Sequence, residues 1–188
     1  MIALDQRLSD MKNLTSAEVK TLSANFLRNQ FRKGQLLLTP GQNLHGLYYI
    51  ESGFVQGYIT HNYIDETIWV KDGGSFLLLP GLFNQETSHH YIEFLTDATA
   101  CMLNLDPLLF PDASNHHLLY KLLQQVYDQE MLLSEKREYI NHLPQAKDRY
   151  QLFKAEFPGI IGQVNNHIIA SLLRMSLKHF VRLKSADL

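Results

Sequence analysis

The stretch from residue 31 to residue 105 consists of short runs of β-branched and aromatic residues, with a Gly, Pro or Asp turn signal roughly every ten residues. Such punctuation is typical of antiparallel strands, because each turn reverses the chain before a run grows long. The middle of the chain is therefore predicted to form an antiparallel sandwich or barrel. The predicted strands cover 31–39, two segments of 47–60 on either side of Ser52-Gly53, 66–71, 90–95 and 100–105.

Ahead of this region, residues 3–29 are predicted to be helical. Thr15, followed three residues later by Glu18, is a capping box in which the hydroxyl and the carboxylate each satisfy an amide at the start of a helix. The apolar residues that follow fall on one helical face: Val19, Leu22, Phe26 and Leu27.

A second helical pattern begins after Pro111-Asp112 and covers about 114–142, which corresponds to a helix about 40 Å long. A helix of this length rarely buries its whole apolar stripe within one small domain. The sequence therefore predicts that it pairs with the same helix of a second subunit, and a helix laid on the barrel of a single chain is the alternative. The stripe comprises Leu119, Leu122, Leu123, Val126, Met131, Leu133 and Ile140, and it is interrupted by Gln129, Glu130, Lys136 and Arg137.

Pro144 ends that helix, and residues 146–157 are predicted to form another, which Pro158-Gly159 ends. The segment 165–184 then has the pattern of a short apolar helix, a tight turn at Met175-Ser176, and a second helix in which apolar and basic residues alternate. This pattern is typical of a helix-turn-helix, whose second helix enters the major groove of DNA.

Charge is distributed unevenly along the chain. Residues 1–143 carry 10 Lys and Arg against 16 Asp and Glu, a net charge of −6, whereas residues 144–188 carry 7 against 3, a net charge of +4. A basic end on an acidic body is expected when only one module meets phosphate. An ordinary solvated surface accounts for the charge difference equally well, so the helix-turn-helix pattern carries the argument.

Several other classes are disfavoured. No stretch approaches the roughly 20 apolar residues that cross a bilayer, and the N-terminus lacks the layout of a signal peptide. The single cysteine, Cys101, has no partner for an internal disulfide, which favours a cytoplasmic setting. Cys101 stands in an apolar run and is expected to be a buried structural thiol rather than a nucleophile.

Nine histidines raise the question of a metal site. His89-His90 would point to opposite faces of a strand, and His116-His117 stand at the start of a helix, where exposed polar residues are ordinary. A cupin-type metalloenzyme needs a His-x-His with a later Glu and His, a spacing that the sequence lacks. We therefore predict no metal ligands, no cofactor, no catalytic residues and no enzymatic activity.

The order of elements, together with four stretches, resembles the Crp/Fnr family of bacterial transcription regulators. The stretches are 48–55, 71–76, 91–97 and 148–153, followed by the final helix pair. The resemblance implies an α+β fold with an antiparallel jelly roll flanked by helices. It implies a sensor domain over 1–143 with a dimerisation helix at about 114–142, and a small helix-turn-helix domain over 144–188.

The resemblance also implies an effector pocket near the glycine turn, with seven candidates: Gly73, Gly74, Ser75, Phe76, Ser88, His89 and Tyr91. Cyclic-nucleotide receptors of this superfamily hold the ribose with a Glu after a Gly and the phosphate with an Arg. Here the corresponding segment 76–80 has no carboxylate, and no Arg stands near Ser88-His89. These departures argue against cAMP, so the cavity is expected to hold another ligand or none.

For the DNA-binding module, the resemblance implies contacts to DNA from five residues: Ser176, Lys178, His179, Arg182 and Lys184. Arg174 stands where the family often has Gly, which favours a DNA-binding module that has lost its function. The retained Arg182 opposes that interpretation. The sequence thus predicts a homodimeric DNA-binding regulator. The alternative is a sensor or interaction protein of the cyclic-nucleotide fold with a vestigial DNA-binding module.

Overall fold

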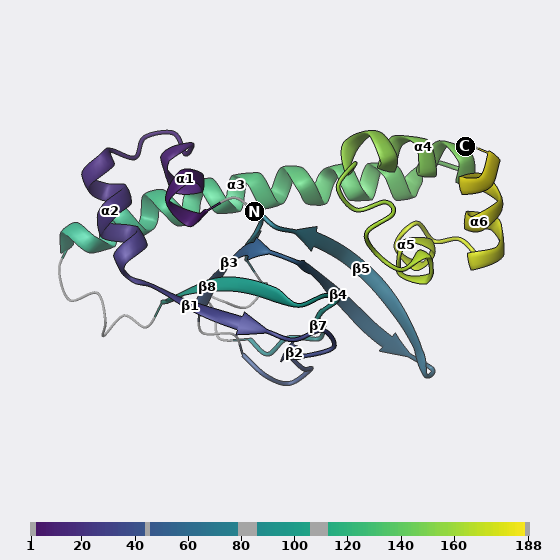
Figure 1. Cartoon of the computed structure of the whole chain (residues 1–188), viewed down its shortest axis with the longest axis horizontal. Coiled ribbons are helices and arrows are strands. Elements are labelled where there is room, and N and C mark those ends of the chain that lie inside the picture. Colours follow the sequence, from purple (N-terminus) through teal and green to yellow (C-terminus); the bar gives the residue numbers. More distant parts are fainter. Residues whose placement is uncertain (1–2, 44–45, 79–85, 106–112, 187–188) are drawn as a thin grey trace.

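The computed structural model of the protein describes residues 3–43, 46–78, 86–105 and 113–186, with no description of the side chains of 113–115. Two four-stranded antiparallel sheets, in the orders β1-β8-β3-β6 and β2-β7-β4-β5, enclose a common apolar core. The long helix α3 runs past both sheets and connects the N-terminal helices at one end to the C-terminal helices at the other (Figure 1). The predicted jelly roll flanked by helices is confirmed.

The strands are β1 Phe26–Phe31, β2 Leu36–Leu38, β3 Gly46–Ser52, β4 Phe54–His61, β5 Ile64–Asp72, β6 Phe76–Leu77, β7 Tyr91–Phe94 and β8 Ala98–Asn104. The Ser52-Gly53 turn between β3 and β4 is confirmed. The single strand predicted over 31–39 is wrong, because a turn containing Gly34, at φ 79°, separates β1 from β2. His90 precedes β7 rather than beginning it.

The N-terminal helix predicted over 3–29 is also wrong in extent. The structure has two shorter helices, α1 Leu4–Ser9 and α2 Ser16–Ala24, and Asn13 between them has a left-handed backbone with φ 66°. Strand β1 begins at Phe26 because its whole length pairs with β8, a long-range contact that overrides the helical pattern. The capping box is confirmed: the Glu18 amide donates to Thr15 Oγ1 at 3.3 Å, and the Thr15 amide donates to Glu18 Oε2 at 2.8 Å.

Helix α3, Ala113–His142, agrees with the predicted range. Pro111-Asp112, the predicted start signal of this helix, lies outside the described residues. Leu118, Leu122 and Val126 pack against α1, α2 and the first sheet, whereas Ile140 packs among the C-terminal helices. One helix therefore contributes to the cores of both ends of the molecule.

The C-terminal helices are α4 Ala146–Glu156, α5 Asn166–Leu172 and α6 Leu177–Ala186, at the predicted places. Their core is formed by Tyr150, Phe153, Ile169 and Phe180, and it also includes Val70 of β5. The predicted boundary at 143/144 falls in the connection between α3 and α4, yet apolar packing crosses it. The C-terminal helices are thus packed onto the jelly roll rather than tethered to it.

Candidate nucleic-acid interface and effector cavity

Helices α5 and α6 form the helix pair that the sequence places at the C-terminus. The side chain of Asn165 caps α5 by accepting a hydrogen bond from the His167 amide at 2.9 Å. Ser176 caps α6, because its hydroxyl accepts from the His179 amide at 3.2 Å. The turn between the helices contains Arg174 in a left-handed conformation, with φ 51°.

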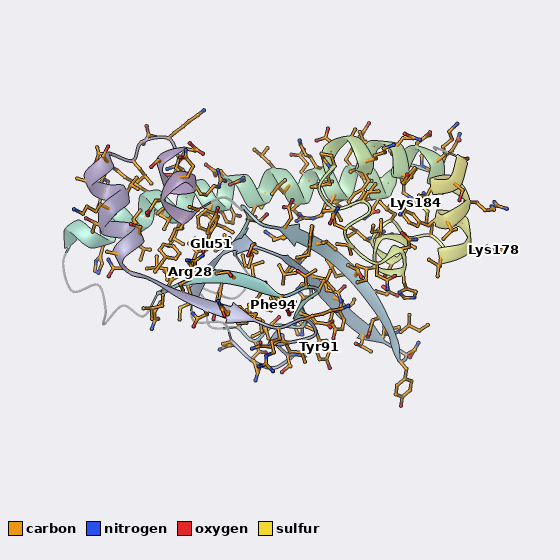
Figure 2. All side chains as sticks on the ribbon, in the orientation of Figure 1. Arg28, Glu51, Tyr91, Phe94, Lys178 and Lys184 are labelled. Atoms are coloured by element: carbon orange, nitrogen blue, oxygen red, sulfur yellow. The ribbon has the colours of Figure 1, made fainter. Side chains whose placement is uncertain are left out.

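The five predicted DNA contacts lie on or next to α6 but not all on one face. Lys178 and Arg182, four residues apart, are both exposed on the same side of the helix. His179 and Lys184 are half-buried, and Lys184 Nζ donates to Asn166 Oδ1 of α5 at 3.1 Å. Figure 2 shows Lys178 projecting outward from the end of the molecule and Lys184 directed back over the helices. Phe180 is fully buried and anchors α6 to Tyr150 through an edge-on ring contact.

The charged residues from residue 157 to the end of α6 are all cations. From residue 157 to residue 186 the sequence contains Arg174, Lys178, Arg182 and Lys184 and no Asp or Glu. A helix with exposed cations and no carboxylate of its own attracts a polyanion. The arrangement can therefore contact a phosphate backbone, with Lys178 and Arg182 as the outward pair.

Arg149 of α4 fixes the position of the turn. Its Nε donates to the Leu173 carbonyl at 2.9 Å, and its Nη1 donates to the Leu143 carbonyl at 2.7 Å. One guanidinium thus joins the α5–α6 turn to the end of α3. The sequence alone does not reveal this role of Arg149, because its hydrogen bonds are to backbone carbonyls that no local pattern indicates.

A bulge in β5 joins the C-terminal helices to the jelly roll. In the β4–β5 pairing Gly57 lies opposite Trp69 and Tyr58 opposite Thr67, so Ile68 has no partner. The Thr67 amide points away from the sheet and donates to Ser171 Oγ of α5 at 2.9 Å. The edge strand β5 is covered by α5 at this point, and a movement of either element would act on the other.

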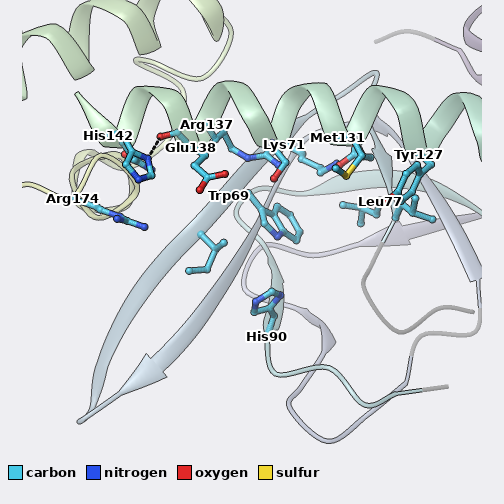
Figure 3. Close-up of a pocket in the computed structure, with 15 residues that line it drawn as sticks. Trp69, Lys71, Leu77, His90, Tyr127, Met131, Arg137, Glu138, His142 and Arg174 are labelled. Atoms are coloured by element: carbon cyan, nitrogen blue, oxygen red, sulfur yellow. Dashed lines mark hydrogen bonds and ion pairs between the residues drawn. The ribbon is translucent and has the colours of Figure 1, made fainter. Parts of the chain in front are cut away.

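A cavity of about 630 Å³ lies between β5, α3 and the α5–α6 turn (Figure 3). Its volume is within the range of small-molecule sites in proteins. The walls come from five separate parts of the chain. The described residues that line the cavity are Ile68, Trp69, Lys71, Leu77, Leu78, His90, Tyr127, Glu130, Met131, Ser134, Arg137, Glu138, Asn141, His142 and Arg174.

A buried ion pair crosses this cavity wall. Lys71 of β5 is only 6% exposed, and its ammonium group is paired with Glu130 of α3 and donates to the Phe76 carbonyl at 2.6 Å. Burial lowers the pKa of Lys71 to about 8, although Glu130 opposes the shift. Burial also lowers the pKa of Arg137, which lies about two helical turns beyond Glu130 on α3. The interruptions Glu130 and Arg137 in the apolar stripe were the sequence signal for these charges.

The predicted effector residues lie elsewhere. Gly73, Gly74 and Ser75 form the turn after β5, and Phe76 is buried in β6. Tyr91 stacks on Tyr58 at 5.0 Å between ring centroids, while Ser88 Oγ accepts from the His90 amide at 3.0 Å and His89 is exposed. None of the seven is among the described residues that line the 630 Å³ cavity, although their neighbours Leu77 and His90 are. Leu79-Pro80 of the glycine-turn segment lie outside the described residues. The seven-residue site stays a prediction.

Other candidate chemistry is limited. Cys101 is buried, and burial raises the pKa of its thiol to about 11, so little thiolate forms at neutral pH. Within the described ranges, His, Cys, Asp and Glu form no group of three or more that could hold a metal ion. No helix among the described residues is both long enough and apolar enough to cross a membrane.

Comparison with known proteins agrees with this geometry. Residues 28–109 match the cyclic nucleotide-binding domain family. The fold is similar to that of the global regulator CLP of Xanthomonas campestris, with a TM-score of 0.70, 17% identity, and 92% of this chain and 93% of that chain covered. FixK2 of Bradyrhizobium japonicum is similar with a TM-score of 0.70, 16% identity, and 86% and 83% coverage. A CRP/FNR-family transcriptional regulator of Thermus thermophilus is similar with a TM-score of 0.65 and 17% identity, and 85% of this chain and 84% of that chain are covered. No curated protein sequence matches the chain.

Residues 28–109 thus resemble cyclic nucleotide-binding domains in sequence, and the chain as a whole has the fold seen in CRP/FNR-family transcriptional regulators. The resemblance seen in the sequence is confirmed. The matched family is a ligand-binding domain, in agreement with the prediction of a non-enzymatic regulator.

Proposed function

We propose that the protein is a homodimeric, cytoplasmic transcription regulator that binds DNA through α6 and dimerises through α3. The observation that carries the proposal is the exposed pair Lys178 and Arg182 on a helix capped by Ser176, in a segment without carboxylates. Lys178 supplies a phosphate contact, and Arg182 contacts guanine or phosphate. In a homodimer the two copies of α6 would contact a palindromic site, one half-site each.

The same proposal assigns the sensor an effector other than cAMP, or no effector. The absence of a carboxylate in 76–80 and of an Arg near Ser88-His89 supports this view, since both groups are needed to hold a cyclic nucleotide in the family's manner. The regulator of Xanthomonas campestris is described as c-di-GMP responsive, so c-di-GMP belongs beside cAMP among the first compounds to be tested.

The test is retention of genomic DNA fragments by the purified protein at two salt concentrations. We expect selective, salt-sensitive retention in the wild type and a loss of roughly tenfold or more in affinity for Arg182→Ala, because one arginine contact to a base contributes about 1–3 kcal/mol. Arg32→Ala is the matched control, since Arg32 is exposed in the turn between β1 and β2.

Retention that is unselective in the wild type, with and without cell-extract metabolites, would contradict DNA regulation. The result would then favour an interaction protein whose DNA-binding module is vestigial. The left-handed Arg174 in the turn is the observation that supports this second function.

A further inference from the structure

The exposed side of α6 has an apolar row as well as cations. Leu177 and Val181 are 42% and 41% exposed, and they are the exposed large apolar side chains of the described C-terminal helices. Because they are four residues apart, they lie one above the other on the same face of the helix. Neither is among the described residues that form or border the three apolar cores, so the packing of the chain leaves this row uncovered.

The apolar row lies beside the cationic row of Lys178 and Arg182. Each residue turns the helix by about 100°, so the two rows are separated by roughly a quarter of the helix circumference. On another side of the helix, the fully buried Phe180 holds α6 in place. Figure 1 shows α6 at the end of the molecule opposite the N-terminal helices, and Figure 2 shows Lys178 projecting outward from that end. The two rows thus form one outward surface on an anchored helix.

The surroundings of the apolar row favour DNA over a protein as its partner. A protein interface buries about 800 Å² on each side, and its core is depleted of lysine. Two apolar side chains bordered by Lys178 and Arg182, in a segment whose charged residues are all cations, do not fit that description. A DNA duplex has the complementary chemistry, because phosphates line the walls of its major groove and methyl groups lie on the floor.

The place of the two apolar residues in α6 also matches the part of a recognition helix that meets bases. Leu177 is the first residue of α6, directly after the capping Ser176, and Val181 follows about one turn later. In helix-turn-helix proteins the N-terminal residues of the second helix contact base edges in the major groove. Thymine alone among the four bases presents a methyl group there, so an apolar side chain can distinguish it from the others.

We propose that Leu177 and Val181 recognise thymine by packing against its C5 methyl group in the major groove, with Lys178 and Arg182 beside them on phosphate or guanine. The inference rests on the proposed function and deepens it, because it names residues that select the DNA sequence and the base that they select. Covering one methyl group removes apolar surface from water and corresponds to about a fourfold gain in affinity.

Uracil differs from thymine only in lacking this methyl group, so replacing thymine by uracil tests the contact directly. The probes are the genomic fragments that the wild type retains selectively, synthesised once with thymidine and once with deoxyuridine. We expect the wild type to bind the uracil fragments at least about fourfold more weakly at the same salt concentration.

The double variant Leu177→Ser/Val181→Ser should bind the two kinds of DNA within about twofold of each other, because it has no apolar row. Serine is preferred to alanine, whose methyl group can itself contact thymine. Both positions are exposed, so the substitutions carry little risk to folding. Val181→Ser alone should lower the ratio of the two affinities, so the comparison does not depend on the double variant.

Lys178→Ala is the matched control, because it removes an exposed cation of the same helix and leaves the apolar row intact. It should weaken binding to both kinds of DNA equally and keep the wild-type ratio. Equal wild-type affinity for the two kinds of DNA, or an unchanged ratio in the serine variants, would overturn the inference and leave DNA binding standing. If the wild type retains no fragment selectively, the proposed function and this inference both fail.

Discussion

Arg174 occupies a backbone conformation that normally favours glycine. With φ 51° its Cβ is crowded against the following peptide, a cost of about 1 kcal/mol for a residue with a side chain. The turn is nevertheless held in place, because Arg149 donates to the carbonyls of Leu173 and Arg174. The fold thus keeps an exposed arginine, at the edge of the cavity, in a conformation that its backbone disfavours.

We therefore expect Arg174→Gly to raise the free energy of unfolding by about 1 kcal/mol, since glycine adopts the left-handed conformation without strain. Chemical denaturation at equilibrium measures the change. Arg174→Ala is the control, because it removes the same side chain and keeps the strained Cβ. An equal gain in both variants would place the cost in the arginine side chain instead of the backbone.

Helix α3 leaves several large apolar side chains exposed to solvent. Tyr120, Tyr127 and Met131 are more than half exposed, and their spacing of seven and four residues places them on one face. Leu132 is exposed to a similar degree on another face of the same helix. Leu122 and Val126 of the stripe predicted from the sequence are buried within the chain itself. The first face is therefore the seam that we expect for the proposed dimer.

Met131→Glu should shift the protein from dimer to monomer, with an increase of at least tenfold in the dissociation constant, because a carboxylate would be buried in the seam. Sedimentation velocity over a range of protein concentrations measures the change. Leu132→Glu introduces the same charge one residue away and should leave the dimer intact. If Leu132→Glu dissociates the dimer and Met131→Glu does not, the seam lies on the other face.

Elements with a local cause were predictable from the sequence. The capping box at Thr15 and the stop at Pro144 depend on neighbouring residues, and both are found at the predicted places. Phe26 was misassigned to a helix because the strand there is stabilised by pairing with β8, more than 70 residues away in the chain. The cavity was not predictable, since its walls come together only when β5, α3 and the α5–α6 turn are packed.

At the scale of the whole molecule, the two predicted domains share an interior. Val70 of β5, only 4% exposed, lies in the same apolar cluster as Tyr150, Phe153 and Phe180. The Thr67–Ser171 hydrogen bond reinforces the contact beside it. We therefore expect the C-terminal helices to unfold together with the sheet that contains β5, although these helices come last in the chain.

Val70→Ala should lower the free energy of unfolding by about 2 kcal/mol and speed amide hydrogen exchange in α4, α5 and α6. Hydrogen exchange followed by mass spectrometry measures the second effect. Val55→Ala is the matched control, because Val55 is fully buried in the core between the two sheets. Equal acceleration of hydrogen exchange in the C-terminal helices of both variants would show that the stability of these helices follows that of the jelly roll.

The shared interior also limits how such a protein can change over generations. Phe54, Val70 and Leu95 belong to the roll in the sequence but pack against the C-terminal helices in space. A C-terminal module transplanted onto another sensor would leave these three side chains behind and arrive with an incomplete interior. We therefore expect recombination at the α3–α4 connection to be disfavoured, and substitutions on its two sides to covary.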